Sequence, residues 1–256
     1  LSSSALAFIF VSENNMKMTT EIRNNWTLEE IRAIYFSPVI DLIYRASQVH
    51  KKYQVTGEVQ VCTLLSVKTG GCSEDCSYCP QAARYSTNIE AHKLMTYEEV
   101  IGKALDAKNN NSTRFCMGAA WRNVRDNSDF DRVIEMVKGV NALGLEVCCT
   151  LGMLSEEQAK RLKEAGLYAY NHNLDTSDEY YGDVITTRSY EDRLNTLNNV
   201  EKAGLSVCCG GIIGLGESDD DRIKLLYTLA TREKHPESVP VNALVAVKGT
   251  PLEGKA

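Results

Sequence analysis

Three cysteines close together in the chain are the first residues that suggest chemistry. Cys72, Cys76 and Cys79 follow two glycines and have the spacing Cys-x3-Cys-x2-Cys. A short loop with these intervals can turn three sulfurs toward one point, and thiolates are the usual ligands of iron–sulfur clusters, commonly four of them. Three protein ligands leave one iron open to an exogenous group. The loop therefore predicts a reactive iron–sulfur cluster.

A zinc loop and a set of structural thiols are the alternatives that this triplet leaves open. Zinc usually takes four ligands, often from two C-x2-C pairs, and the sequence has no second pair of that kind. Structural thiols would simply be buried among apolar side chains, because free cysteine is among the most buried residue types.

Three further cysteines occupy apolar runs that we expect to be strands: Cys116, Cys148 and Cys208. Neighbours along a strand face opposite sides, so if Cys148 and Cys208 point inward, Cys149 and Cys209 point toward covering helices and serve packing. Cys62 is interpreted as packing or a loop edge. Spacing alone leaves simple burial open for the first three as well, but their separate strands would allow them to converge on one interior.

The elements that would position these residues alternate between short apolar runs and longer helical segments. The expected strands are 59–67, 114–117, 146–151, 167–171, 205–213 and 239–245. Segments 142–149 and 202–209, and more loosely 164–171, repeat a helix that ends on glycine and leads into a buried strand. Glycine suits the left-handed residue just past a helix end. This repetition predicts parallel strands with helical crossovers, in an α/β, TIM-type (β/α) barrel.

Residues 26–57 are expected to form helices that precede the barrel. Thr27 with Glu30 forms a capping box, as do two later pairs, Thr96 with Glu99 and Ser155 with Gln158. Ser37 and Pro38 predict a second helix with Ser37 as N-cap and Pro38 at the first helical position. Four residues are expected to form its apolar face: Leu42, Ile43, Ala46 and Val49.

Composition excludes several classes of function. The chain has 256 residues, nine cysteines and a formal net charge of −6, with no cluster of lysine and arginine. Nucleic-acid and membrane partners are therefore not expected. The odd cysteine count favours a reducing compartment. Residues 1–25 are interpreted as a disordered tail or the remnant of a targeting sequence, and the expected location is mitochondrial or otherwise cytoplasmic.

The motif Cys72-x3-Cys76-x-Tyr78-Cys79 resembles the signature of radical S-adenosylmethionine (radical SAM) enzymes. The resemblance implies a 4Fe–4S cluster on these cysteines, with S-adenosylmethionine bound at the open iron. It also implies one-electron cleavage to a 5′-deoxyadenosyl radical, which abstracts hydrogen from an unactivated C–H bond. A partial or full (β/α) barrel is implied too, in agreement with the strand count.

From about residue 30 onward the chain resembles the biotin synthase family. The sequence of one stretch, 148–154, is more similar to eukaryotic members than to bacterial ones. The stretches that carry this likeness are 65–72, 112–121, 170–176, 184–189, 210–217 and 237–244. The resemblance implies dethiobiotin as substrate, conversion to biotin, and a flavodoxin or ferredoxin system as electron donor to a homodimer. It also implies that Cys116, Cys148 and Cys208 hold a 2Fe–2S cluster that supplies the sulfur.

The same resemblance assigns polar residues near the substrates. Asn and Asp are unusual in strands, and polar groups at the carboxyl ends of barrel strands are typical of active sites. Asp175 is expected to accept hydrogen bonds from ribose hydroxyls, and Asn173 to bridge nucleoside and substrate. Asn171 and Asn242 are expected to bind the ureido ring of the substrate, since an amide complements it. Arg193 is expected to pair with the methionine carboxylate, although without the resemblance it would be placed on a helix surface.

His172 lies between two of these polar residues in the sequence. It is interpreted as a strand residue with satisfied hydrogen bonds and not as a ligand, because its neighbours, on the opposite face of the strand, are the ones assigned to the site.

Two rival functions remain at this point. Another radical SAM enzyme, such as a maturase, would share the Cys72 loop but not the second cysteine set, and an iron–sulfur electron-transfer or regulatory protein would not cleave S-adenosylmethionine. Six strands instead of eight predict a chain truncated at both ends or, alternatively, an open, incomplete barrel whose last strand needs a partner. The arginine that is the fourth ligand of the 2Fe–2S cluster in the family is expected beyond residue 256. Turnover by this chain alone is therefore not expected.

Overall fold

The computed structural model describes residues 22–255, so the part of the predicted tail before residue 22 lies outside the described residues. Two helices come first, α1 (Leu28–Tyr35) and α2 (Val39–Tyr53). Parallel strands and helices then alternate through β1 (Cys62–Lys68), α3 (Tyr97–Asn109), β2 (Arg114–Ala119), α4 (Ser128–Ala142), β3 (Glu146–Thr150), α5 (Glu156–Glu164) and β4 (Ala169–Asn171). The remaining elements are α6 (Asp178–Val184), α7 (Tyr190–Lys202), β5 (Ser206–Cys208), β6 (Gly211–Ile213), α8 (Asp219–Ala230) and β7 (Val241–Ala243).

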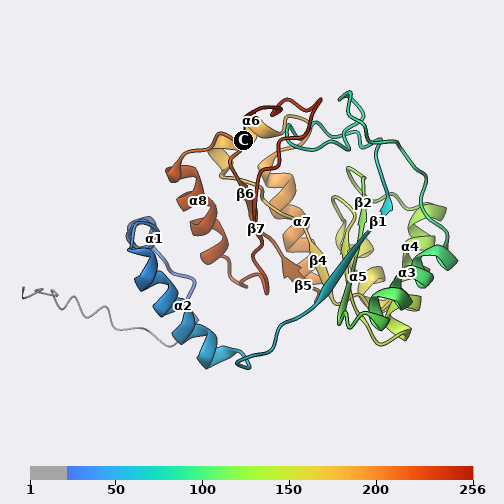
Figure 1. The fold of residues 1–256 in the computed structure, drawn as a ribbon, viewed down its shortest axis with the longest axis horizontal. Helices are drawn as coiled ribbons and strands as arrows, with labels where there is room; N and C mark the ends of the chain where they lie inside the picture. The colour runs from blue at the N-terminus through green and yellow to red at the C-terminus, as the bar shows by residue number, and fades with distance from the viewer. Residues whose placement is uncertain (1–21, 256) are drawn as a thin grey trace, which may run out of the picture.

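The strands form a parallel sheet in sequence order, β1-β2-β3-β4-β5, with β6 and β7 paired beside it. Single bridges from Asp175 to Gly211 and from Cys208 to Ser238 connect the two sheets. Helices pack on one face, where α4 lies on β3 and α7 on β5 (Figure 1). Each of the six predicted runs contains a strand, and the arrangement is that of a truncated TIM-type α/β barrel.

Alternate strand residues divide the sheet into two faces. On the helix side Phe115, Val147 and Tyr170 are fully buried and form the core with Cys149 and Cys209. This burial agrees with a packing role for the second cysteine of each doublet. Leu64, Cys116 and Cys148 share the other face in register. Two residues further along, Asn171 and Cys208 are paired on that face as well.

The run 205–213 is not one strand, as predicted, but two short ones separated at Cys209 and Gly210. The chain passes very close to its neighbour there, since a Cβ on Gly210 would lie 1.8 Å from the carbonyl oxygen of Pro240. Gly211 then donates a backbone hydrogen bond of 3.1 Å to the same oxygen. The glycine thus allows a change of strand partner that a larger residue would block.

Helix ends mostly follow the sequence signals. The predicted capping boxes at Thr27, Thr96 and Ser155 are all present. Glycines 144, 166 and 204 follow α4, α5 and α7 in the left-handed region, with φ of +79°, +97° and +74°. The repeated helix–glycine–strand unit is therefore confirmed in its geometry.

The start of α2 was predicted wrongly. Pro38 is the N-cap and Val39 the first helical residue, because the Ser37 hydroxyl donates backward to the Ala33 carbonyl and caps nothing. The expected apolar face is helical but is not buried: Ile43 is 64% exposed, and no residue of α2 is buried. Among the described residues, no helix is long and apolar enough to cross a bilayer.

Candidate functional site

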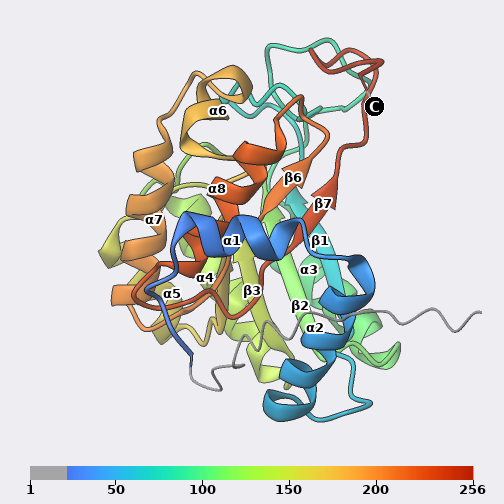
Figure 2. The same cartoon turned by 90° about the vertical axis from the view of Figure 1, so that its left-hand side faces the viewer.

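A pocket of about 190 Å³ opens at the carboxyl ends of the first four strands. Most residues predicted for the radical-generating site line it: Cys72, Cys76, Cys79, Asn171, Asn173, Asp175 and Arg193. The long loop after β1 lies over this end of the sheet together with α6 and the C-terminal segment (Figures 1 and 2). The sheet therefore brings residues from β1 and from the β4–α7 region to one place.

Two glycines and a set of backbone hydrogen bonds shape the cysteine loop. Gly70 and Gly71 have φ of +66° and +65°, and a Cβ on Gly70 would lie 2.9 Å from the Cα of Ala91. Cys72 donates to the Gln81 carbonyl at 3.0 Å, and Cys79 donates to the Cys76 carbonyl at 2.9 Å. These bonds close the loop so that all three sulfurs reach the same pocket.

The donor set fits an iron–sulfur cluster better than a single metal ion. All three cysteines are free thiols, and Cys76 is buried. No three His, Cys, Asp or Glu side chains of residues 22–255 surround one ion position. A multi-iron cluster spreads its thiolates further apart than one ion does, and thiolates alone suit it. Burial raises the pKa of Cys76 to about 12, and this effect outweighs the charges of Arg188 and Arg193, which lower it.

Asp175 and Arg193 face each other in the pocket instead of standing free. Both are almost fully buried, and they form an ion pair. Arg193 also donates to the Asn173 carbonyl at 2.6 Å and to the Tyr181 hydroxyl at 2.9 Å. Tyr78 of the cysteine loop donates to Asp175 at 2.9 Å. The buried pair thus ties the cysteine loop to the end of β4, and the helix-surface placement of Arg193 is excluded.

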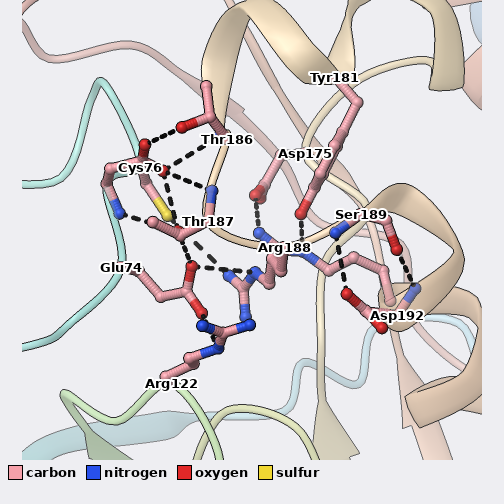
Figure 3. Close-up of polar contacts among 12 residues, drawn as sticks. Glu74, Cys76, Arg122, Asp175, Tyr181, Thr186, Thr187, Arg188, Ser189 and Asp192 are labelled. Carbon is pink, nitrogen blue, oxygen red and sulfur yellow. Dashed lines mark hydrogen bonds and ion pairs between the residues drawn. The ribbon is translucent and has the colours of Figure 1, made fainter.

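A second set of contacts joins the cysteine loop to the segment between α6 and α7. The Asp75 carboxylate accepts from the backbone N–H groups of Thr186 and Thr187, at 2.9 and 3.1 Å, and from both of their hydroxyls. Burial raises the pKa of Asp75, but the hydrogen bonds from these threonines outweigh it and lower the pKa to about 2. Figure 3 shows the neighbouring Glu74, Arg122, Thr187 and Arg188 converging beside Cys76.

The second cysteine set lies on the sheet face opposite the helices. Cys116 and Cys148 are register partners on adjacent strands. Hydrogen bonding between the two thiols lowers the pKa of Cys116 and, together with burial, raises the pKa of Cys148. Cys208 accepts a hydrogen bond from the Asn171 amide at 3.1 Å. Three thiols on one face fit a cluster below the pocket, and Asn171 touches both regions.

Asn242 and His172 do not lie as predicted. Asn242 is exposed on β7 and does not line the pocket, so the structure does not bring it to Asn171. The prediction that His172 is satisfied is wrong, because it is buried at 3% exposure and its Nε2 has no hydrogen-bond partner among the described residues. Burial, with Arg193 and Arg188 nearby, lowers its pKa well below the usual value, so the ring is neutral.

Sequence reasoning missed several residues that hold the site. Asp75, Thr186, Thr187 and Arg188 are charged or hydroxyl residues in loops, with no periodic pattern to single them out. Their contacts join positions 111 to 113 residues apart in the chain. The motif Cys-Ser-Glu-Asp-Cys gave one indication of such contacts, because two adjacent acidic residues inside a tight loop need partners once they are buried.

Comparison with known proteins agrees with this geometry. The model of the radical SAM superfamily matches residues 66–229. Biotin synthase from Cytophaga hutchinsonii is 68% identical over 91% of this chain and 69% of its own length. "Biotin synthase, mitochondrial" from Arabidopsis thaliana is 60% identical over 90% of this chain and 61% of its own length. The chain thus spans about two thirds of the relatives it matches.

Solved structures support the fold alone. Methylornithine synthase (PylB) superimposes with a TM-score of 0.77 at 23% identity, covering 89% of this chain and 67% of that one. The FeFe-hydrogenase maturase HydG gives 0.71 at 19% identity, covering 88% and 52%. Both share the fold of this chain. On the superfamily match and the high identity to its relatives, this chain belongs to the biotin synthase family of radical SAM proteins.

Proposed function

We propose that this chain carries the radical-generating and sulfur-donating sites of a biotin synthase, which converts dethiobiotin to biotin. The observation that carries the proposal is the single pocket shared by Cys72, Cys76, Cys79 and the polar residues at the end of β4. Two unactivated C–H bonds of the substrate are replaced by C–S bonds, and one S-adenosylmethionine is consumed for each. The barrel keeps water away from the radicals.

The residues divide the work by position. Cys72, Cys76 and Cys79 hold the 4Fe–4S cluster, which when reduced supplies the electron that cleaves S-adenosylmethionine. Asp175 and Asn173 bind the nucleoside, and Arg193 orients the methionine carboxylate with N–H groups not used by Asp175, Asn173 and Tyr181. Asn171, which lines the same pocket, binds the substrate.

Below the pocket, Cys116, Cys148 and Cys208 hold the 2Fe–2S cluster, which when bound supplies the sulfur. The Asn171 amide, bonded to the Cys208 sulfur, keeps the substrate position next to that face. This arrangement supports sulfur insertion over the electron-transfer alternative, which has no use for a second thiol set beneath a substrate pocket.

The test is anaerobic reconstitution with iron and sulfide, followed by reductant and S-adenosylmethionine. We expect 5′-deoxyadenosine from the wild-type chain and none from C76S. C62S is the matched control, because Cys62 is an exposed thiol outside the pocket, and it should form the nucleoside normally. Nucleoside formation by C76S at the wild-type rate would reject the assignment of the loop.

Three finer proposals concern the surroundings of the protein. A flavodoxin or ferredoxin system is the electron donor, and the protein is a homodimer, for which light scattering should give twice the chain mass. A mitochondrial location is supported by the Arabidopsis relative, while other relatives are bacterial. Imaging of the protein fused to a fluorescent marker in cells of its source would test the compartment.

A further inference from the structure

Arg188 is a buried cation beside the site, and the binding roles proposed so far do not include it. Its side chain is 8% exposed, and the residue lines the same pocket as the three loop cysteines. Its Nη2 lies 3.9 Å from the sulfur of Cys76, within the range of a hydrogen bond to sulfur. Figure 3 shows the guanidinium between Cys76 and Glu74.

This guanidinium has far fewer partners than its neighbour. Arg193 donates to three oxygen groups, whereas the Nε of Arg188 has no hydrogen-bond partner among the described residues. The acid nearest to it, Glu74, is 3.9 Å from that atom and is shared with Arg122, at 3.3 Å, and with the Thr187 hydroxyl. A buried charge is costly unless it is paired and hydrogen-bonded, so the unused donors point to a group that the site takes up.

The backbone around Arg188 is fixed on both sides. On one side the Asp75 carboxylate holds Thr186 and Thr187. On the other side Ser189 is the N-cap of α7 in a capping box with Asp192. An arginine between two anchored segments keeps its guanidinium aimed at one place with little entropy left to lose. The place it faces is the Cys76 sulfur.

We propose that Arg188 donates a hydrogen bond to the cluster-ligating sulfur of Cys76 and thereby raises the reduction potential of the 4Fe–4S cluster. The inference rests on the proposed function, because it requires a cluster on this loop. Hydrogen bonds to the sulfurs are among the factors that set such potentials. A cationic donor stabilises the reduced cluster more than the oxidised one, because reduction adds negative charge that the sulfurs share.

The first measurement is a redox titration of the reconstituted chain followed by electron paramagnetic resonance. R188Q is expected to lower the one-electron equilibrium constant for reduction about tenfold, which corresponds to about 59 mV. R122Q is the matched control, because Arg122 also pairs with Glu74 but does not line the pocket. Its potential should match the wild type. An unchanged potential in R188Q with full iron content, or an equal drop in R122Q, would overturn the inference.

The second measurement does not depend on how well R188Q folds. Wild-type chain labelled with guanidino-15N arginine should show a nitrogen hyperfine coupling to the reduced cluster in pulsed spectra. R188K keeps the charge and should lose this coupling. Absence of the coupling in the wild type, or its persistence in R188K, would overturn the hydrogen bond but leave the proposed function standing. Failure of the wild type to hold any cluster would overturn both.

Discussion

Asp175 combines an unusual backbone with a side chain that is fully engaged. Its φ is +69°, one of two positive values at non-glycine residues among those described. Its carboxylate is 2% exposed, accepts a hydrogen bond from the Tyr78 hydroxyl and forms an ion pair with Arg193. A left-handed non-glycine residue costs energy and is held only where the surroundings determine it, which is common at functional sites. The bonds to the cysteine loop and to α7 supply that constraint.

The first prediction concerns this pair. D175N leaves the buried charge of Arg193 without its anion, so we expect a loss of about 3–5 kcal/mol in the free energy of unfolding. Y78F removes only one hydrogen bond to the same carboxylate and should cost about 1 kcal/mol. Urea unfolding of the metal-free chains measures both.

The control for D175N is an exposed carboxylate. Asp126 pairs with Arg161 but has a side chain that is 68% exposed, so D126N should change the free energy of unfolding by less than about 0.5 kcal/mol. If D175N were no more costly than D126N, the buried pair would not stabilise the fold as described.

At the scale of elements, the hydrogen bonds from Thr186 and Thr187 to the Asp75 carboxylate, here called the loop clamp, predict that the stability of the fold depends on pH. The folded-state pKa is about 2, below the ordinary 3.8, so the clamp stabilises the fold fully above about pH 4. Its contribution, about 2 kcal/mol, is lost as the pH falls from about 4 to 2. D75N should therefore be less stable than the wild type at pH 6 and approach it near pH 2, in urea unfolding followed across pH.

The exposed carboxylate of Asp131 gives a comparison for this clamp, since its side chain is 65% exposed. D131N should leave the acid limb of the stability curve where the wild type has it. If D75N had the same free energy of unfolding as the wild type at every pH, the role given to the threonine hydrogen bonds would be contradicted.

The junction between β5 and β6 gives a second prediction at this scale. G210A places a methyl group against Pro240 and should destabilise the chain by about 1–3 kcal/mol or more. Gly102 in α3 has nothing within 4 Å of its Cβ position, so G102A should stabilise by about 0.5–1 kcal/mol. Thermal unfolding of the two variants should shift in opposite directions, and equal shifts would exclude the close approach as the cause.

An element could be predicted from the sequence when the interactions that form it join residues close together in the chain. Strands and capping boxes depend on neighbours within a few residues, so the six runs and Thr27, Thr96 and Ser155 could be predicted. The boxes at Ser189 and Ser218 use Asp at the third helical position and escape the usual Glu or Gln pattern. Nothing local shows that Gly210 meets Pro240.

The site divides in the same way. The grouping of the three loop cysteines and the orientation of the strand cysteines could be predicted, because spacing and strand alternation are local patterns. The engagement of Arg193 by Asp175, and the clamp of Asp75 on Thr186, depend on tertiary folding over long separations. His172 shows the limit most clearly, because the sequence led us to expect satisfied hydrogen bonds, whereas its Nε2 lacks a partner among the described residues.

On the scale of the whole molecule, α1 packs against the rest of the structure, whereas α2 buries none of its residues. In α1, Ile31 is buried, and Tyr35 and Arg32 bond to Asp219 and Asp220 at the start of α8, at 2.8 and 2.7 Å. Figure 2 shows α1 in front of α8, and Figure 1 shows α2 lying apart from the sheet. The barrel elements and α1 therefore form one packed body, to which α2 contributes no buried side chain.

This arrangement predicts where substitutions matter. I43S on α2 should change the free energy of unfolding by less than about 0.5 kcal/mol, because the side chain is already exposed. L197A in α7 should cost about 2–5 kcal/mol, since Leu197 is fully buried. Urea unfolding compares them, and a cost for I43S above about 1 kcal/mol would mean that α2 packs against a surface of its own.

The exposed edge of strand β1 has a consequence for the association of the chain in solution. Within residues 22–255 this strand pairs with β2 alone, and Leu64 on it is 74% exposed. An open strand edge offers backbone donors and acceptors to any other strand, and apolar side chains beside it strengthen that attraction. Concentrated samples of this chain are therefore expected to associate edge to edge, and dynamic light scattering over a range of concentrations would detect it.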